Sequence, residues 1–167
     1  MTPSVRPERP GDVAAIRLVN EAAFPTPAEA ELVDMLRADG DLILSLAAEQ
    51  DGLIAGHVAF SRIVIERDDE PGAAVSLAPV AVLPQYQRNG IGKALIARGL
   101  EMLAAKGEGL VVVLGDPAYY RRFGFTAPEA VPFASDYSGP YLQALRLAGR
   151  RVMPGRLRYP SAFAALG

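Results

Sequence analysis

The chain has 167 residues, 50% hydrophobic and 22% charged, which suits an ordinary globular protein of one domain, since domains run to about 100–200 residues. It has no cysteine and one histidine, which excludes disulfides, iron–sulfur clusters, thiolate or multi-histidine metal sites and a cysteine nucleophile. A net charge of −2, with no secretory signal and no long apolar run, predicts a cytoplasmic protein that binds neither nucleic acid nor membrane.

The charge is distributed unevenly along the chain. Residues 1–75 carry 14 acidic and 6 basic side chains, whereas residues 76–167 carry 5 acidic and 11 basic ones. This asymmetry is consistent with ordinary solvated surface. It is also consistent with a split site, in which an anionic cofactor binds the second part and a cationic acceptor lies near the first.

Two helices are expected first. Pro-Gly-Asp at residues 10–12 precedes apolar residues at helical spacing, which predicts a helix capped by Asp12 and ending near Ala23. Residues 24–27 contain two prolines that break it. Residues 28–38 predict a second helix, with Leu32, Met35 and Leu36 on one side.

Strands are expected next. Residues 42–48 and 53–65 are rich in apolar and β-branched residues, and the Asp51-Gly52 pair between them predicts a hairpin. Residues 75–82 predict a further strand. Pro79 disturbs its pairing, because proline cannot donate to a ladder.

The next segment predicts a crossover. An amphipathic helix starts near Ile91 and ends at Lys106-Gly107, with an apolar stripe formed by Ile91, Leu95, Leu100 and Leu103. The apolar run at 110–114 predicts a strand buried on both faces and parallel to the strand at 75–82. A short helix capped by Asp116 and closed by Gly124 follows, and then a strand at 141–147. The fold predicted is one α/β domain with a mixed sheet.

A glycine-containing turn at residues 87–93 joins the strand ending at Val82 to the helix starting near Ile91. Glycine permits positive φ and leaves bare backbone, while the first turn of a helix offers unpaired N–H groups to an anion. The turn therefore indicates an anion site or, alternatively, a plain capping turn. Its spacing does not fit a Walker A loop, because Gln87 stands where that loop requires glycine and Ala94 stands where it requires serine or threonine. It does not fit a Rossmann fingerprint either, because residue 95 is leucine where a small residue is required.

Two motifs carry a resemblance to a known family. The pattern Q-x-x-G-x-G at residues 87–92 resembles the pyrophosphate loop of the GNAT superfamily of N-acetyltransferases. One strand later, Tyr-Tyr-Arg-Arg-Phe-Gly-Phe at residues 119–125 resembles that superfamily's aromatic segment. Residues 56–61 and 159–163 look most similar to its small bacterial YhbS-like branch. The resemblance extends over nearly the whole chain.

The resemblance implies a fold and a domain organisation. The implied fold is a single α/β GNAT domain over residues 1–167, with a mixed, mostly antiparallel sheet and helices on both faces. A central parallel strand pair would be splayed around the cofactor. The core would span about residues 3–148, with a C-terminal extension at 149–167.

The resemblance also implies acetyl-CoA as cosubstrate, with no metal. Main-chain amides of Arg88, Asn89, Gly90, Ile91, Gly92 and Lys93 would hold the diphosphate, with charge added by the Arg88 and Lys93 side chains. Gln87 would orient the loop. Free main-chain groups of Val80, Ala81 and Val82 would bind the pantetheine arm as an added strand would.

Two groups are candidates for the chemistry. The N–H of Val82 could stabilise the charge on the thioester oxygen, and Tyr120 could donate a proton to the leaving thiolate and contact the cofactor. Tyr120 has the alternative role of a core aromatic residue. The base that deprotonates the amine is left open between His57 and a water relay. Glu29, Glu31 and Asp34 could line the acceptor side and attract a cation, or they could form a solvated face.

The function expected is direct acetyl transfer from acetyl-CoA to a primary amine on a small molecule or peptide. Without cysteine, the most plausible covalent intermediate is removed. A non-catalytic acyl-CoA sensor or partner module is the alternative function. The identity of the acceptor amine, the use of acyl groups longer than acetyl and the formation of a homodimer stay open.

Overall fold

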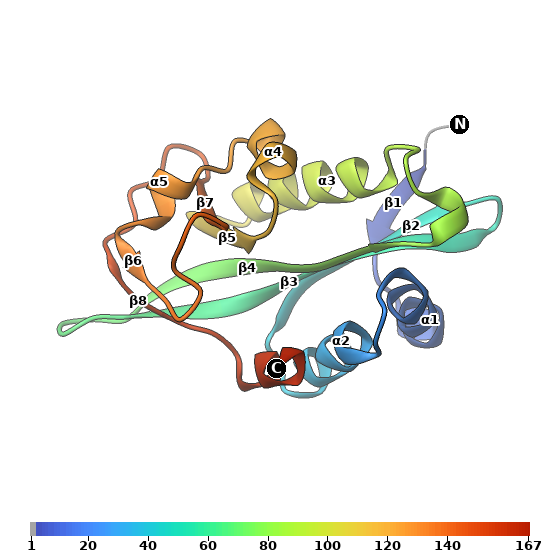
Figure 1. Ribbon diagram of the computed structural model, residues 1–167, viewed down its shortest axis with the longest axis horizontal. Coiled ribbons are helices and arrows are strands. Elements are labelled where there is room, and N and C mark those ends of the chain that lie inside the picture. Colours follow the sequence, from blue (N-terminus) through green and yellow to red (C-terminus); the bar gives the residue numbers. More distant parts are fainter. Residues whose placement is uncertain (1–2) are drawn as a thin grey trace. The chain divides into compact units, whose positions relative to one another are not determined.

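The computed structural model describes residues 3–167 (Figure 1). The strands are β1 (Ser4–Pro7), β2 (Leu42–Gln50), β3 (Leu53–Glu66), β4 (Gly72–Val82), β5 (Leu110–Leu114), β6 (Phe133–Ala134), β7 (Leu142–Arg146) and β8 (Gly155–Arg158). The α-helices are α1 (Val13–Ala23), α2 (Ala28–Ala38), α3 (Ile91–Ala105), α4 (Pro117–Tyr120) and α5 (Ala127–Ala130). Short 3-10 helices are η1 (Pro10–Asp12), η2 (Pro84–Tyr86), η3 (Arg121–Phe123) and η4 (Ser161–Leu166).

The strands pair in the order β1-β2-β3-β4-β5-β7, and β8 pairs with both β3 and β6. The β4–β5 and β6–β8 pairs are parallel, whereas β1–β2, β2–β3, β3–β8 and β5–β7 are antiparallel. The expected mixed, mostly antiparallel sheet with one crossover through a helix is therefore confirmed.

The chain divides into two compact units. The first contains the described residues up to Ser61 together with Ala78–Glu101 and Ser161–Gly167, and the second contains Arg62–Leu77 and Met102–Pro160. Three elements, β3, β4 and α3, contribute residues to both units.

In the first unit, helices cover both faces of the β2–β3 ladder (Figure 1). Side chains alternate along a strand, so Gly56 and Phe60 share one face of β3 while His57 and Ala59 share the other. Gly56 contacts α3, and Ala59 packs with Ile16 of α1 and Val33 of α2. Asp51 and Gly52, with φ of 53° and 79°, form the hairpin turn that the sequence predicts.

In the second unit, a hydrophobic core forms from residues of β3, β4, β5, α5, β6, β7 and β8. It contains buried residues at positions 63, 65, 74, 110, 112, 130, 133, 142, 144 and 157. Residues 149–167, expected from the sequence to be an extension, supply β8 of this unit and η4, which packs against α2 in the first unit.

Several sequence expectations need correction. Met35 is 42% exposed, and α2 instead buries Ala30, Leu32, Val33 and Leu36. Leu114 is 51% exposed, so β5 is not buried along its whole length. Asp12 precedes α1, but its side chain makes no cap bond to that helix and instead accepts hydrogen bonds from Arg6 and from the Arg9 amide.

Candidate active site

The loop between η2 and α3 exposes its backbone in an unusual conformation. Arg88 and Gly90 have φ of +67° and +81°, and residues 87–90 are exposed. A Cβ at Gly90 would meet nothing within 4 Å, so the main chain there faces open space. Gly92, by contrast, lies within the first turn of α3. It contributes to an open helix start by lacking a side chain, not by adopting a positive φ.

The same loop leads directly into the N-terminus of α3. The carbonyl of Gly90 accepts the first helical bond, from the Ala94 amide at 3.0 Å. The N–H groups of residues 91–93 then have no carbonyl four residues earlier within the helix, and they carry the positive end of its dipole. The Gln87 side-chain amide donates to the Val82 carbonyl at 3.0 Å, which ties the loop to the end of β4. These features together make an anion-binding geometry.

Two glycines determine how closely α3 approaches β3. A Cβ at Gly56 would lie 2.7 Å from Cγ2 of Ile91 and 3.1 Å from Cδ1 of Leu95. On the helix side, a Cβ at Gly99 would overlap the ring of Phe60. Side chains at either position would push the helix away, so these glycines set the position of the helix start. Sequence reasoning missed both, because neither lies at a turn.

The last residues of β4 present main-chain groups in two directions. The Ala81 carbonyl lies 3.3 Å from the position of a Cβ on Gly56, and the Leu83 amide donates to the Ala55 carbonyl at 2.8 Å. The odd-numbered residues therefore direct their main-chain groups toward β3. Because these groups alternate along a strand, the N–H groups of Val80 and Val82 point away from β3.

Tyr120 lies at the end of α4 in the second unit. Asp116 caps this helix, accepting from the Ala118 amide at 2.9 Å, and Gly124, with φ of +100°, closes the following η3, as the sequence predicts. The ring packs edge-on against Tyr119 and Phe125, with centroid distances of 5.0 and 5.9 Å. Burial, with a smaller effect from Tyr119, raises the pKa of Tyr120 to about 12.

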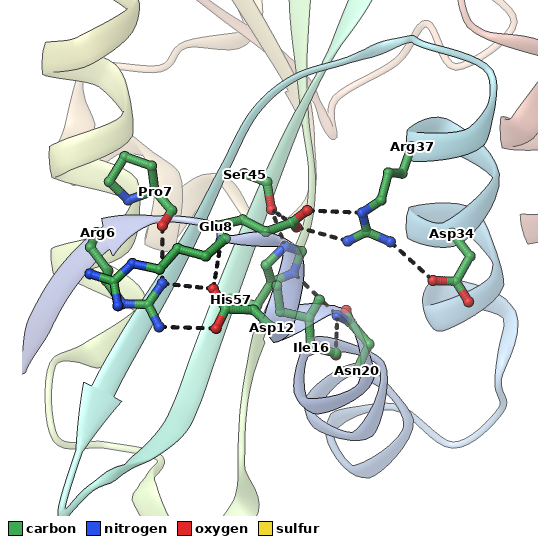
Figure 2. Close-up of polar contacts among 11 residues, drawn as sticks. Arg6, Pro7, Glu8, Asp12, Ile16, Asn20, Asp34, Arg37, Ser45 and His57 are labelled. Atoms are coloured by element: carbon green, nitrogen blue, oxygen red, sulfur yellow. Dashed lines mark hydrogen bonds and ion pairs between the residues drawn. The ribbon is translucent and has the colours of Figure 1, made fainter.

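His57 lies in a buried polar network of the first unit (Figure 2). Its Nδ1 lies 3.2 Å from Nδ2 of Asn20, and its Nε2 lies 2.8 Å from Oγ of Ser45. The Asn20 amide nitrogen also donates to the Ile16 carbonyl, so the nitrogen faces the ring and Nδ1 accepts. Nε2 therefore carries the proton and donates to Ser45, whose hydroxyl donates to Glu8 at 2.6 Å.

Desolvation lowers the pKa of His57 to about 4, with smaller effects from the Glu8 charge, which raises it, and the Arg37 charge, which lowers it. The side chain is 0% exposed and both ring nitrogens are bonded. His57 therefore cannot contact an incoming amine. The role of a packed, hydrogen-bonded histidine accounts for it.

The acidic candidates on α2 differ in their surroundings. Asp34 pairs with Arg17. It also pairs with Arg37, which binds Glu8 through two hydrogen bonds (Figure 2). Glu31 is exposed, whereas Glu29 is half-buried with one oxygen that has no hydrogen-bond partner among the described residues. Asp34 is therefore committed to ion pairs, which leaves Glu29 and Glu31 as carboxylates for an acceptor.

Two further classes of site, metal centres and membrane-spanning helices, concern residues 3–167. Among these residues, His, Asp and Glu side chains nowhere gather in threes as metal ligands do. Likewise, none of the helices formed by these residues has both the length and the hydropathy needed to cross a bilayer.

Comparison with known proteins gives consistent matches. The model of the Acetyltransferase (GNAT) domain matches residues 42–127. The chain is 42% identical over 122 residues to the uncharacterized N-acetyltransferase YhbS of Escherichia coli (strain K12), covering 72% of each chain.

Solved structures agree. A crystal structure of E. coli YhbS in complex with CoA has a TM-score of 0.90 at 35% identity, covering 99% of this chain and 93% of that one. A GNAT acetyltransferase from Brucella melitensis in complex with acetyl-CoA has a TM-score of 0.81 at 41% identity, covering 97% and 98%. The chain therefore belongs to the GNAT family of N-acetyltransferases.

Proposed function

We propose that this protein transfers the acetyl group of acetyl-CoA to a primary amine by direct attack. The observation that carries the proposal is the bare, left-handed turn at Arg88 and Gly90 leading into the N-terminus of α3. Anion binding at such a turn suits the diphosphate of CoA. The relatives from E. coli and B. melitensis were crystallised with CoA and acetyl-CoA, which supports the same ligand here.

The cofactor would be held mostly by main chain. The diphosphate would accept hydrogen bonds from amides of residues 88–93, namely Arg88, Asn89, Gly90, Ile91, Gly92 and Lys93. Gln87 would act indirectly, by holding the loop against Val82. The outward main-chain groups of Val80 would pair with the pantetheine amides, and Val82 would present its outward N–H at the thioester end of that arm. The buried Ala81 would keep this edge in register with β3.

In the reaction, the amine nitrogen forms a bond to the thioester carbonyl carbon, the C–S bond breaks, and its electron pair leaves on sulfur. The N–H of Val82 would stabilise the developing oxyanion. Tyr120 would donate to the leaving thiolate. A phenol with a pKa of about 12 is a weaker acid than a thiol with a pKa near 8.5, so it would act chiefly as a hydrogen-bond donor that stays protonated.

The amine must lose a proton before it attacks. His57 is buried and would not act as the base that accepts this proton. Glu29, Glu31 or a water relay would accept it. The acidic first part of the chain favours a positively charged acceptor, such as a polyamine or a lysine or N-terminal amino group.

Gly90→Val tests the cofactor site. The added side chain would occupy the space over the bare backbone, so acetyl-CoA binding measured by calorimetric titration should fall by at least ~100-fold, the scale set by losing a charge-assisted contact with the diphosphate. Gly40→Val is a matched control, because Gly40 has φ of +77°, also faces open space and ends α2. Both variants place valine at a similar positive φ, +81° at Gly90 and +77° at Gly40.

Affinity retained in Gly90→Val would refute the loop assignment, as would an equal loss in both variants. Released thiol is then measured with pools of amines. Tight acetyl-CoA binding with no turnover on any amine would favour the acyl-CoA sensor over the enzyme.

A further inference from the structure

We propose that Gln143, on β7, is a positioning residue that holds the Tyr120 phenol in place through Gly115. The inference rests on the role proposed for Tyr120, at the end of α4, and adds to it a residue of strand β7. All three residues belong to the second unit.

The ring of Tyr120 lies directly on the main chain of Gly115. A Cβ at Gly115 would lie 2.6 Å from Cε2 and 3.2 Å from Cδ2 of that ring. The ring therefore depends on a glycine five residues earlier for its space. A shift of the Gly115 main chain would move the ring with it.

Gln143 fixes that main chain. Its Nε2 donates to the Gly115 carbonyl at 3.0 Å and to the Tyr141 carbonyl at 3.3 Å. The Gly115 amide also donates to the Tyr141 carbonyl, at 3.0 Å. The β5–β7 register ends at the Leu114–Leu142 pair. The side chain of Gln143 therefore connects the segments of these two strands past the end of the ladder.

The amide of Gln143 has only one favourable orientation. Both neighbours are carbonyl oxygens, so a flipped amide would place Oε1 against them. The side chain is 0% exposed, and Oε1 has no hydrogen-bond partner among the described residues. An apolar side chain of similar size would avoid that unpaired oxygen, so the two bonds from Nε2 are what the glutamine contributes.

The far end of the same segment is held from the same strand. Leu145, two residues on and therefore on the same face of β7, has its Cδ1 3.0 Å from where a Cβ of Gly124 would be. Both ends of the stretch that carries Tyr120 thus lie against β7. Gln143 fixes the start with directional bonds, whereas Leu145 supports the end by packing.

A double-mutant cycle tests the proposal. Gln143→Met keeps the shape of the side chain and removes both donors, and it is made with Tyr120 intact and with Tyr120→Phe. With Tyr120 intact, kcat should fall about ten-fold while KM for acetyl-CoA changes less than about two-fold. With Tyr120→Phe, the same change should lower kcat by less than about two-fold, because no phenol is left to misplace.

A spectroscopic measurement supplements the kinetics. In protein labelled with ¹³Cζ-tyrosine, the Tyr120 signal, assigned by its loss in Tyr120→Phe, should shift in Gln143→Met. The signals of Tyr86, Tyr137 and Tyr159 should stay in place, because these tyrosines contact neither Tyr120 nor Gln143. Thr126→Ala is the control, because it removes the N-cap of α5 without touching Gly115 or Gln143. It should leave the Tyr120 signal and kcat unchanged.

Gln143→Leu also lacks both donors and replaces Gln143→Met if that variant does not fold. An equal fall of kcat in both Tyr120 backgrounds, or an unshifted Tyr120 signal, would overturn the inference about Gln143. If Tyr120→Phe leaves kcat unchanged, the role proposed for the tyrosine fails and the inference fails with it. That result would leave the proposed acetyl-CoA site standing, because the site does not depend on Tyr120.

Discussion

Tyr120 is the residue whose chemistry can be tested most directly. The phenol is held against Gly115, and burial keeps its pKa near 12, so it stays protonated throughout the pH range in which an enzyme would be assayed. Tyr120→Phe should lower kcat about ten-fold or more with little change in KM for acetyl-CoA.

Because the raised pKa of about 12 keeps the Tyr120 phenol protonated over this range, that deficit should be constant from pH 7 to 10. Tyr119→Phe serves as the control, since its ring packs on the same cluster and its side chain has no role in the proposed step. A deficit that disappears at high pH, or one equally large in Tyr119→Phe, would contradict the assignment.

At this scale, some assignments could be made from the sequence alone and others could not. The cap at Asp116 and the turn glycines at 90 and 124 follow from local backbone requirements, which short motifs encode. The partners of His57 come from positions 20 and 45, and Gln143 bonds to a carbonyl 28 residues away. No local pattern specifies contacts of that kind.

The element that matters most for the cofactor site is α3, because its first turn provides the N–H groups. Gly56→Ala would place a Cβ 2.7 Å from Cγ2 of Ile91 and displace that turn. We expect a loss of about 1–3 kcal/mol in the free energy of unfolding, the usual cost of overpacking, with weaker acetyl-CoA binding.

Gly11→Ala is the matched control, because a Cβ there would meet nothing within 4 Å. Combining Gly56→Ala with Ile91→Leu removes the overlapping methyl group and should restore part of both losses. Chemical denaturation and calorimetric titration measure the two effects. If Gly56→Ala is destabilised but binds acetyl-CoA with unchanged affinity, the position of the first turn of α3 does not determine binding, and the prediction is wrong.

Elements with strong periodicity were predicted well. The bounds of α2 and β5 agree with those expected, and α1, β2, β3 and α3 agree closely. The short strands β1, β6 and β8 were missed. Each has four residues or fewer, which is too short for an alternating pattern to stand out, and each is defined by a partner strand instead.

For the molecule as a whole, buried His57 predicts acid sensitivity. Its pKa is lowered to about 4 in the folded state, whereas an unfolded histidine titrates near 6.5. Between these values the unfolded chain binds a proton that the folded protein does not, so stability falls as the pH drops through that interval. The full effect is about 3 kcal/mol.

Urea denaturation at pH 7.5, 6.5 and 5.5 measures this effect, with His57→Gln as the comparison. The difference in unfolding free energy between the two proteins should shrink by about 1 kcal/mol on acidification from pH 6.5 to 5.5. The carboxylate of Asp12, whose pKa its hydrogen bond to Arg6 lowers to about 2, loses its contribution only at lower pH and is common to both proteins. A gap that does not change with pH would mean that His57 is not protonated on unfolding in this range.

The network around His57 also determines where the protein can safely be shortened. Glu8 precedes the first α-helix, yet it accepts hydrogen bonds from both Ser45 and Arg37. Trimming the chain past this point would remove the acceptor of the buried Ser45 hydroxyl proton and one of the two carboxylates that pair with Arg37. Fusion tags therefore belong ahead of β1, with the native residues from Ser4 onward retained.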